Sequence, residues 1–307
     1  MSRPPRIGLV GCGQWGQWIL RDLISLGCHC VVADLSAPGR ELAMGLGAGD
    51  CVRHASELPR ELDGYIVATP ASTHHEVILS LLDRGRPIYV EKPLTDSART
   101  ARSLAENAPH GLFVMEKWRY HGGVQAIADL CRSGRLGKVR AIHCRRVQSG
   151  QSQRDVNPIW TLLPHDLSIV DHILGELPTA IAADATHGPN GEALSLHAKL
   201  RAQDVEVFIT ISSLSAHKER SLLVSLEGGA LSMVDPMADH ILFKAAASPV
   251  DEPAQRIPVG TEMPLLLELK AFIDHLQGGP PPMAEAARSV RSVALIEQLL
   301  NMASSAG

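Results

Sequence analysis

The sequence predicts an α/β fold, with a parallel, doubly wound sheet in the N-terminal part and a second domain after it. Two observations carry this prediction. Between residues 6 and 115, apolar runs typical of buried strands alternate with runs whose apolar residues recur at helical spacing, as in parallel sheets. The chain has 307 residues, which exceeds one ordinary core and suits two domains of moderate size.

The first strand, Arg6–Val10, ends in a G-x-G-x-x-G turn that opens a helix. The first glycine permits the tight turn, the second removes a side chain where a pyrophosphate approaches backbone N–H groups, and the third lets helix and strand pack closely. A pyrophosphate held in this turn lies at a helix N-terminus. The residues predicted to contact the cofactor here are Gly11, Gly13, Gln14, Trp15 and Gly16.

An acidic residue, Asp34, follows the second strand, Cys30–Ala33, about 20 residues beyond the glycines, as the dinucleotide fingerprint requires. Its carboxylate can accept hydrogen bonds from the adenosine ribose and repels a 2′-phosphate, which favours NAD over NADP. Arg40 lies close enough in sequence to soften this preference, so NADP stays an alternative. A solvated loop acid or a helix N-cap is the other interpretation of Asp34.

Further alternation extends the parallel sheet. Helices are predicted at 40–46, 76–84 and 97–107, and strands at 64–68, 87–90 and 111–115. Ligands of doubly wound sheets bind outside the carboxyl ends of the strands, where the loops 69–74 and 91–93 lie. The residues of these loops that we expect at the cofactor are Thr69, Pro70, His74, Glu91 and Lys92.

Composition and charge exclude several classes of protein. Hydrophobic residues make up 45% of the chain and charged residues 20%, which is typical of globular proteins. The formal net charge of -4 provides no basic field for nucleic acid or an anionic membrane. No apolar run approaches the roughly 20 residues that cross a bilayer, and the N-terminus is unlike a signal peptide. We therefore expect a cytoplasmic protein with neither partner.

The cysteines and histidines do not predict a metal site. The six cysteines lack a C-x-x-C pair or regular spacing, and we expect reduced thiols. Cys28 and Cys30 flank His29, but neighbours along a strand point to opposite faces. His74 and His75 likewise diverge, and no histidines and acids have a known ligand spacing.

Two later motifs complete a set that occurs in order along nearly the whole chain. They are W-R-Y at 118–120 and the stretch 160–168, and E-K-P at 91–93 is the most specific member of the set. With these motifs the sequence resembles the Gfo/Idh/MocA family, the glucose-fructose oxidoreductase and inositol dehydrogenase group. The resemblance implies a Rossmann domain followed by a C-terminal α+β domain with an open, mainly antiparallel sheet. One face of that sheet commonly forms dimers or tetramers in the family.

We place the domain boundary at 120/121, so that residues 1–120 bind the cofactor and residues 121–307 form the substrate and oligomerisation domain. A final helix at about 284–304 is predicted to pack in a core, and one interpretation places it against the Rossmann domain. The other elements predicted in the C-terminal domain are helices at 124–132 and 264–276 and strands at 139–146, 193–200, 205–212, 222–226 and 240–244.

Hydride transfer at a hydroxyl-bearing carbon needs a group that takes or gives the hydroxyl proton. Lys92 is the first candidate, because an ammonium at a strand end beside the cofactor stabilises an alkoxide-like oxygen. A surface lysine paired with Glu91 is the alternative. His165 is the second candidate. Pro164 suits the first helical position and Gly175 the helix end, so we expect a neutral His165 in the first turn.

Four more residues are predicted to contact the substrate. Arg119 and Tyr120 reach the cleft by the family pattern, with a domain-interface role as the alternative, and Tyr120 is a second possible proton donor. Asp166 either binds substrate or complements the positive helix end. Many relatives have an aspartate four residues before the histidine, where this chain has Thr161.

These features predict an NAD-dependent oxidoreductase that moves a hydride between nicotinamide and a hydroxyl or keto carbon of a sugar, cyclitol or sugar nucleotide. We expect a homodimer or homotetramer formed through the C-terminal sheet. Two alternatives stay open. One is a non-catalytic NAD(P)-binding sensor in which Thr161 reflects lost chemistry. The other is a reductase of an imine or a non-sugar carbonyl.

Overall fold

The computed structural model describes residues 3–108, 110–150 and 156–305. They form two compact units, of which the first comprises Met1–Lys117 with Leu265–Val293 and the second Trp118–Pro264 with Ala294–Gly307. The units divide within a few residues of the predicted boundary at 120/121. They differ from the prediction in one respect, because the first unit also includes a segment from the C-terminal part of the chain.

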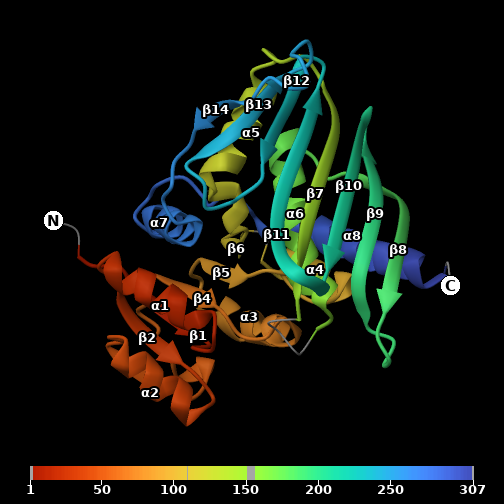
Figure 1. The fold of residues 1–307 in the computed structure, drawn as a ribbon. Helices are drawn as coiled ribbons and strands as arrows, with labels where there is room; N and C mark the ends of the chain where they lie inside the picture. The colour runs from red at the N-terminus through yellow and green to blue at the C-terminus, as the bar shows by residue number, and fades with distance from the viewer. Residues whose placement is uncertain (1–2, 109, 151–155, 306–307) are drawn as a thin grey trace. The chain divides into compact units, whose positions relative to one another are not determined.

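In the described part of the first unit, six parallel strands form one sheet in the order β3-β2-β1-β4-β5-β6 (Figure 1). The strand order reverses between β1 and β4, and ligands of such sheets bind at this switch point, outside the carboxyl ends of the strands. The predicted parallel, doubly wound sheet is therefore confirmed. The strands are β1 (Arg6–Val10), β2 (His29–Ala33), β3 (Asp50–Val52), β4 (Gly64–Val67), β5 (Ile88–Glu91) and β6 (Leu112–Met115).

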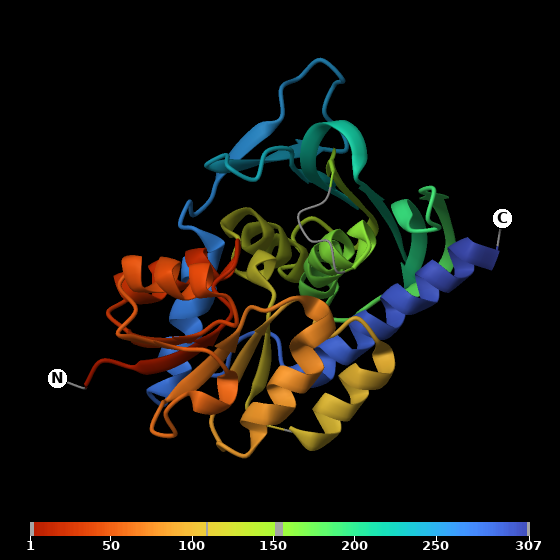
Figure 2. The same ribbon diagram turned by 90° about the horizontal axis from the view of Figure 1, so that it is seen from below.

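Helices cover both faces of this sheet (Figure 2). On one face, Ile19 and Leu23 share a buried core with Leu9 and with Leu269 and Phe272, which come from a helix more than 200 residues later in the chain. That helix, rather than the predicted final helix alone, returns to the first unit. The helices of this unit are α1 (Gly16–Ser25), α2 (Ala37–Gly45), α3 (His74–Leu82), α4 (Ala98–Asn107) and α7 (Pro264–Leu276).

The described part of the second unit contains an eight-stranded sheet in the order β14-β13-β12-β11-β7-β10-β9-β8. Only β7 and β10 pair in parallel, so the sheet is mainly antiparallel, as the resemblance implied. The strands are β7 (Val139–Ser149), β8 (Thr179–His187), β9 (Ala193–Ala202), β10 (Val205–Ser212), β11 (Leu214–Leu226), β12 (Gly229–Met233), β13 (His240–Ala245) and β14 (Gln255–Pro258).

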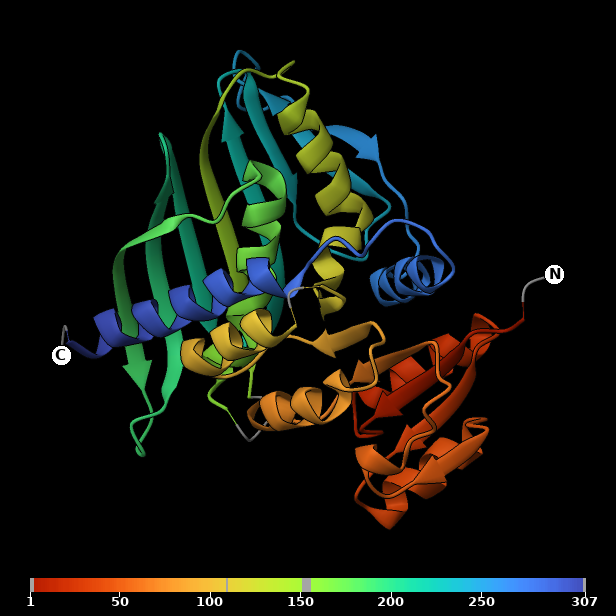
Figure 3. The ribbon, with the colours of Figure 1, turned by 180° about the vertical axis from the view of Figure 1, so that it is seen from behind.

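Helices α5 (Gly122–Arg132) and α6 (Pro158–Leu174) lie on one face of this sheet (Figure 3). Alternate residues of β10, Val207, Ile209 and Ile211, point into that face and are buried. The final helix, α8 (Ala286–Ser305), is divided, because its residues up to 293 group with the first unit and the rest with the second.

Two further properties of the described residues bear on the predictions. None of their helices combines the length and the apolar character that a bilayer crossing requires. All six cysteines are free thiols, as expected from their spacing.

Candidate active site

The glycine turn follows β1 at the switch point of the parallel sheet. Gly11 has φ 92°, which favours glycine, and a Cβ there would lie 2.7 Å from the carbonyl oxygen of Ala68. A Cβ on Gly16 would collide with the carbonyl oxygen of Gly11. Gly13 faces open space, with nothing within 4 Å of a Cβ built on it. The first and third glycines thus serve packing, and the second leaves the backbone accessible to a pyrophosphate.

Asp34 ties the end of β2 to this turn. Its Oδ2 accepts a hydrogen bond from the Cys12 backbone N–H at 2.7 Å, and its Oδ1 accepts from the N–H and the hydroxyl of Ser36. Helix α2 is capped by Ser36, whose hydroxyl accepts from the Gly39 N–H. The N-cap interpretation of Asp34 was therefore wrong. Arg40, in the first turns of α2, donates from Nη1 to the Asp34 carbonyl at 2.7 Å, so its guanidinium lies beside the end of β2.

His74 links the two loops that were predicted to border the cofactor. The residue is 1% exposed, with Nδ1 2.9 Å from the carbonyl oxygen of Pro93 and Nε2 2.9 Å from that of Thr69. These loops follow β5 and β4. The ring therefore fixes the distance between them, which makes His74 a positioning residue for the cofactor loops.

Lys92 directly follows β5, and its side chain is partly exposed. Its backbone N–H donates to Glu91 Oε2 at 3.0 Å. Burial raises the pKa of the Glu91 carboxyl, and the ammonium groups of Lys92 and Lys117 oppose this shift. Glu91 thus contacts the backbone of Lys92 through a carboxyl group that is itself buried, and the role of the Lys92 side chain stays a prediction.

A second buried carboxyl, Glu268, lies close to Glu91 but comes from α7. It is 0% exposed, and its Oε2 accepts a hydrogen bond from the Tyr89 hydroxyl at 3.4 Å. Burial raises the pKa of Glu268 well above its ordinary value, and the Glu91 charge adds to the shift. Sequence reasoning missed this group. The available signal was its spacing, since Glu268 falls on the apolar face of α7 with Leu265 and Phe272.

Helix α6 carries the histidine in the second unit, and it begins earlier than predicted. The N-cap is Asn157, whose Oδ1 accepts from the backbone N–H groups of Ile159 and Trp160, and Pro158 holds the first helical position. Pro164 lies inside the helix. His165 is therefore central in α6, and the prediction that it lies in the first turn of the helix was wrong.

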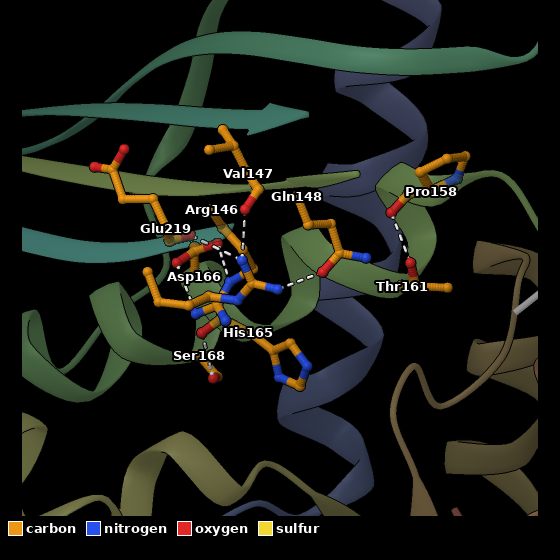
Figure 4. Close-up of polar contacts among 10 residues, drawn as sticks. Arg146, Val147, Gln148, Pro158, Thr161, His165, Asp166, Ser168 and Glu219 are labelled. Carbon is orange, nitrogen blue, oxygen red and sulfur yellow. Dashed lines mark hydrogen bonds and ion pairs between the residues drawn. The ribbon is translucent and has the colours of Figure 1, made fainter. Parts of the chain in front are cut away.

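The far end of α6 agrees with the prediction, because Gly175 ends the helix with φ 79°. His165 is also the only residue from Thr161 to Val170 that is not buried. Thr161 is buried, and its hydroxyl donates to the Pro158 carbonyl at 2.8 Å (Figure 4). This hydroxyl is thus bonded inside its own helix, one turn before the histidine.

Asp166 forms a bidentate ion pair with Arg146 of β7 (Figure 4). The distances are 2.7 Å from Nε to Oδ2 and 3.1 Å from Nη2 to Oδ1, and each side chain is 3% exposed. The helix-end interpretation of Asp166 was therefore wrong. The Arg146 Cζ lies 4.5 Å from the centroid of the Trp118 ring, which packs edge-on against the His165 ring at 6.3 Å.

Arg119 and Tyr120 lie in a short 3-10 turn, Lys117–Tyr120, and both are buried. The Arg119 guanidinium donates to the Asp171 carboxylate near the C-terminal end of α6, so it has an acidic partner within its own unit. The sequence assigned no partner to Asp171. Contact between Arg119 and the substrate stays a prediction.

Comparisons with known proteins agree with this geometry. Residues 5–112 match the model of an oxidoreductase family with an NAD-binding Rossmann fold. An inositol 2-dehydrogenase of Streptomyces avermitilis is 28% identical over 207 residues, which are 62% of this chain and 60% of the relative. The rhizopine catabolism protein MocA of Rhizobium meliloti is 33% identical over 150 residues, 45% of this chain and 46% of that protein.

These matches span about half of the relatives' lengths, and the fold similarity extends further. The solved structure of UDP-N-acetylglucosamine 3-dehydrogenase GnnA from Acidithiobacillus ferrooxidans superposes with a TM-score of 0.86 and 18% identity, covering 99% of each chain. The similarity supports the two-domain fold of the whole chain.

Proposed function

We propose that this protein is an NAD-dependent oxidoreductase of the Gfo/Idh/MocA family, because residues 5–112 match that family's model of an NAD-binding Rossmann fold. Its proposed substrates are molecules with a hydroxyl or keto carbon, of the sugar, cyclitol or sugar-nucleotide class. The similar proteins include an inositol dehydrogenase and a sugar-nucleotide dehydrogenase, which supports this class.

One observation carries the proposal: the turn after β1 has the features that a dinucleotide requires. A side chain on Gly13 would point into open space, so the backbone N–H groups are accessible, and Asp34 stands at the end of the neighbouring strand. Residues 69–74 and 91–93 follow the next strands, and His74 holds them together. These residues fit an NAD site, and Arg40 beside Asp34 keeps NADP as the alternative.

The bound nicotinamide supplies the carbon that accepts or donates hydride. We assign the proton chemistry to Lys92 and His165. The Lys92 ammonium stabilises negative charge on the substrate oxygen, and the His165 imidazole accepts the hydroxyl proton during oxidation and returns it during reduction. Thr161 cannot replace the aspartate of many relatives in this task, because a hydroxyl remains neutral and this one is bonded to Pro158.

The assembly and location are also proposals. The sheet face opposite α5 and α6 carries an exposed Leu223 and a stack of the His143 and Phe208 rings at 4.8 Å, which suits contact with a second copy. We propose a homodimer or homotetramer through this face, and the mass in solution tests it. We also propose a cytoplasmic location, as expected in the sequence analysis.

The test is to incubate the purified protein with NAD or NADP and a panel of polyols, sugars and cyclitols, and to follow nicotinamide absorbance. We expect turnover that falls at least about 100-fold in Lys92→Ala and in His165→Ala, since general acid–base groups contribute about that much or more. NADH binding should persist in His165→Ala. No NADH binding to the unmodified, folded protein would refute the proposal. Binding without turnover on any substrate would favour the sensor alternative, for which the missing acid at Thr161 is the supporting observation.

A further inference from the structure

Two arginines stand opposite each other on the helix-covered face of the second unit's sheet. Arg146 of β7 is the direct cross-strand partner of Arg220 of β11. Both share their strand face with buried apolar residues, such as Cys144 and Leu222, which are also cross-strand partners. Like charges directly opposite in an antiparallel pair destabilise it. Such a pair therefore calls for compensating negative charge.

Among the described residues, one of these two guanidinium groups has a carboxylate as its hydrogen-bond partner. Asp166 engages Arg146 with both carboxylate oxygens. Arg220 Nη1 donates to the carbonyl oxygens of Val147 and Glu219 at 2.8 Å, and its Nη2 donates to the Gln148 side-chain oxygen. All three acceptors are neutral. Two arginines and one aspartate leave a net charge of +1 in this cluster.

The nearest acid in sequence does not compensate Arg220. The Glu219 side chain points to the opposite sheet face, where its Oε2 accepts from Arg145 Nε at 2.8 Å. Arg220 is at the same time half-buried, and this burial together with the Arg146 charge lowers its pKa to about 10, although the Asp166 charge opposes the shift. It remains protonated at neutral pH. Among the described residues, Arg220 therefore has neutral hydrogen-bond acceptors, and the one acid whose charge acts on it, Asp166, already pairs with Arg146 through both oxygens.

The cluster adjoins the histidine proposed to act on the substrate. Asp166 is the neighbour of His165 in α6, and the Trp118 ring contacts both the Arg146 guanidinium and the His165 ring. Arg220 lies one strand further along the same sheet face. A substrate held at His165 thus has a cationic group close to it within the same unit.

We propose that Arg220, together with Gln148, forms an anion subsite, and that the substrate is a polyhydroxylated molecule bearing a carboxylate or a phosphate. The planar guanidinium fork matches either oxyanion in a bidentate way, and an arriving anion supplies the missing negative charge opposite Arg146. The anion would then accept the hydrogen bond that Arg220 Nη2 donates to the Gln148 side-chain oxygen. This inference rests on the proposed function, because it names the substrate class for the same site.

The experiment measures how tightly matched ligands bind to the protein–NADH complex. Each neutral sugar or polyol of the panel is paired with its uronate or aldonate and with its phosphate ester, and affinities are measured by calorimetry. We expect at least one acid to bind about 10- to 100-fold more tightly than its neutral counterpart, as a charge-assisted contact allows. The two acid series distinguish carboxylate from phosphate recognition.

Three variants locate the effect. Arg220→Gln should abolish the preference for the acid while leaving the affinities for the neutral counterpart and for NADH within about twofold. Arg220→Lys keeps the charge but loses the planar guanidinium group that binds an oxyanion in a bidentate way, so it should retain part of the preference for the acid. The control, Arg145→Gln, removes a charge from the next position of β7 on the opposite face and should change none of these affinities.

Two results would overturn the subsite. One is a panel in which no acid binds better than its neutral counterpart. The other is an equal loss of acid affinity in Arg220→Gln and Arg145→Gln, which would indicate a general charge effect. If Arg220→Gln does not fold, Arg220→Lys decides the question, because it must weaken the acid and spare the neutral ligand. NADH affinity is read separately, so a failure of the proposed function is distinguishable.

Discussion

The buried ion pair between Arg146 and Asp166 permits a quantitative prediction for Asp166→Asn. The substitution keeps the side-chain volume and one acceptor oxygen but removes the charge. Arg146 would then be an unneutralised cation, 3% exposed and directly opposite a second cation, Arg220. Breaking a buried pair by removing one partner costs about 3–5 kcal/mol. We expect a loss in this range in the free energy of unfolding of the second unit.

The protein contains a matched control for this measurement. Asp129 pairs with Arg132 on α5 at 2.6 Å, and these side chains are 69% and 48% exposed. Exposed pairs contribute about 0–1 kcal/mol, so Asp129→Asn should change stability by no more than that. The assay is urea denaturation followed by tryptophan fluorescence, because Trp118 contacts the Arg146 guanidinium and reports on the site.

A double variant separates the charge effect from packing. Replacing a buried pair by apolar residues of similar volume is often neutral or stabilising. Arg146→Met combined with Asp166→Leu should therefore recover most of the stability that Asp166→Asn loses, less the cation–π contact with Trp118, which is worth about 0.5–2 kcal/mol. Equal losses for Asp166→Asn and Asp129→Asn would refute the reasoning. So would a double variant less stable than Asp166→Asn.

Three other predictions concern the first unit. Gly13→Val should leave the melting temperature unchanged, because the new side chain enters open space, but should lower NADH affinity at least about 10-fold in calorimetry. Unchanged affinity would contradict the assigned cradle. Gly16→Ala should destabilise the fold, because its Cβ meets the Gly11 carbonyl. The raised pKa of Glu268 means that its stabilising contribution is complete below its unfolded pKa and is lost as pH rises through the folded value. Thermal denaturation from about pH 5 to about pH 8 should therefore show Glu268→Gln gaining stability over the unmodified protein, by at most about 1.4 kcal/mol per pH unit. A pH-independent difference would contradict this.

The sequence predicted the parallel sheet well because its strands carry strong local signals. A parallel strand covered on both faces is a continuous apolar run, and the glycine turn marks the end of β1. The strands that were missed lack such signals. Strand β8, Thr179–His187, has four alanines and no buried residue, and β3 has three residues. Their pairing with neighbouring strands, rather than their own pattern, makes them strands.

The error in α6 arose from applying a sound rule to the wrong proline. Proline is favoured at the first helical position, but Pro158 satisfies this rule better than Pro164, because Asn157 precedes it as an N-cap. The ion pair of Arg146 with Asp166 and the approach of Glu268 to Tyr89 could not be predicted. They join residues 20 and 179 positions apart, and no periodic pattern encodes such pairs.

Two features of the second unit, the neutral Thr161 and the cationic Arg220, have a common physical consequence. A carboxylate at position 161, one turn before His165, would repel an anionic substrate, and this chain has the neutral Thr161 there. Among the described residues, Arg220 has only neutral hydrogen-bond acceptors, so an anionic substrate would supply a negative charge that a neutral substrate would not. Both differences shift the electrostatic potential near His165 in the positive direction. The replacement of the acid at 161 therefore fits an enzyme whose substrate brings its own negative charge better than it fits lost catalysis.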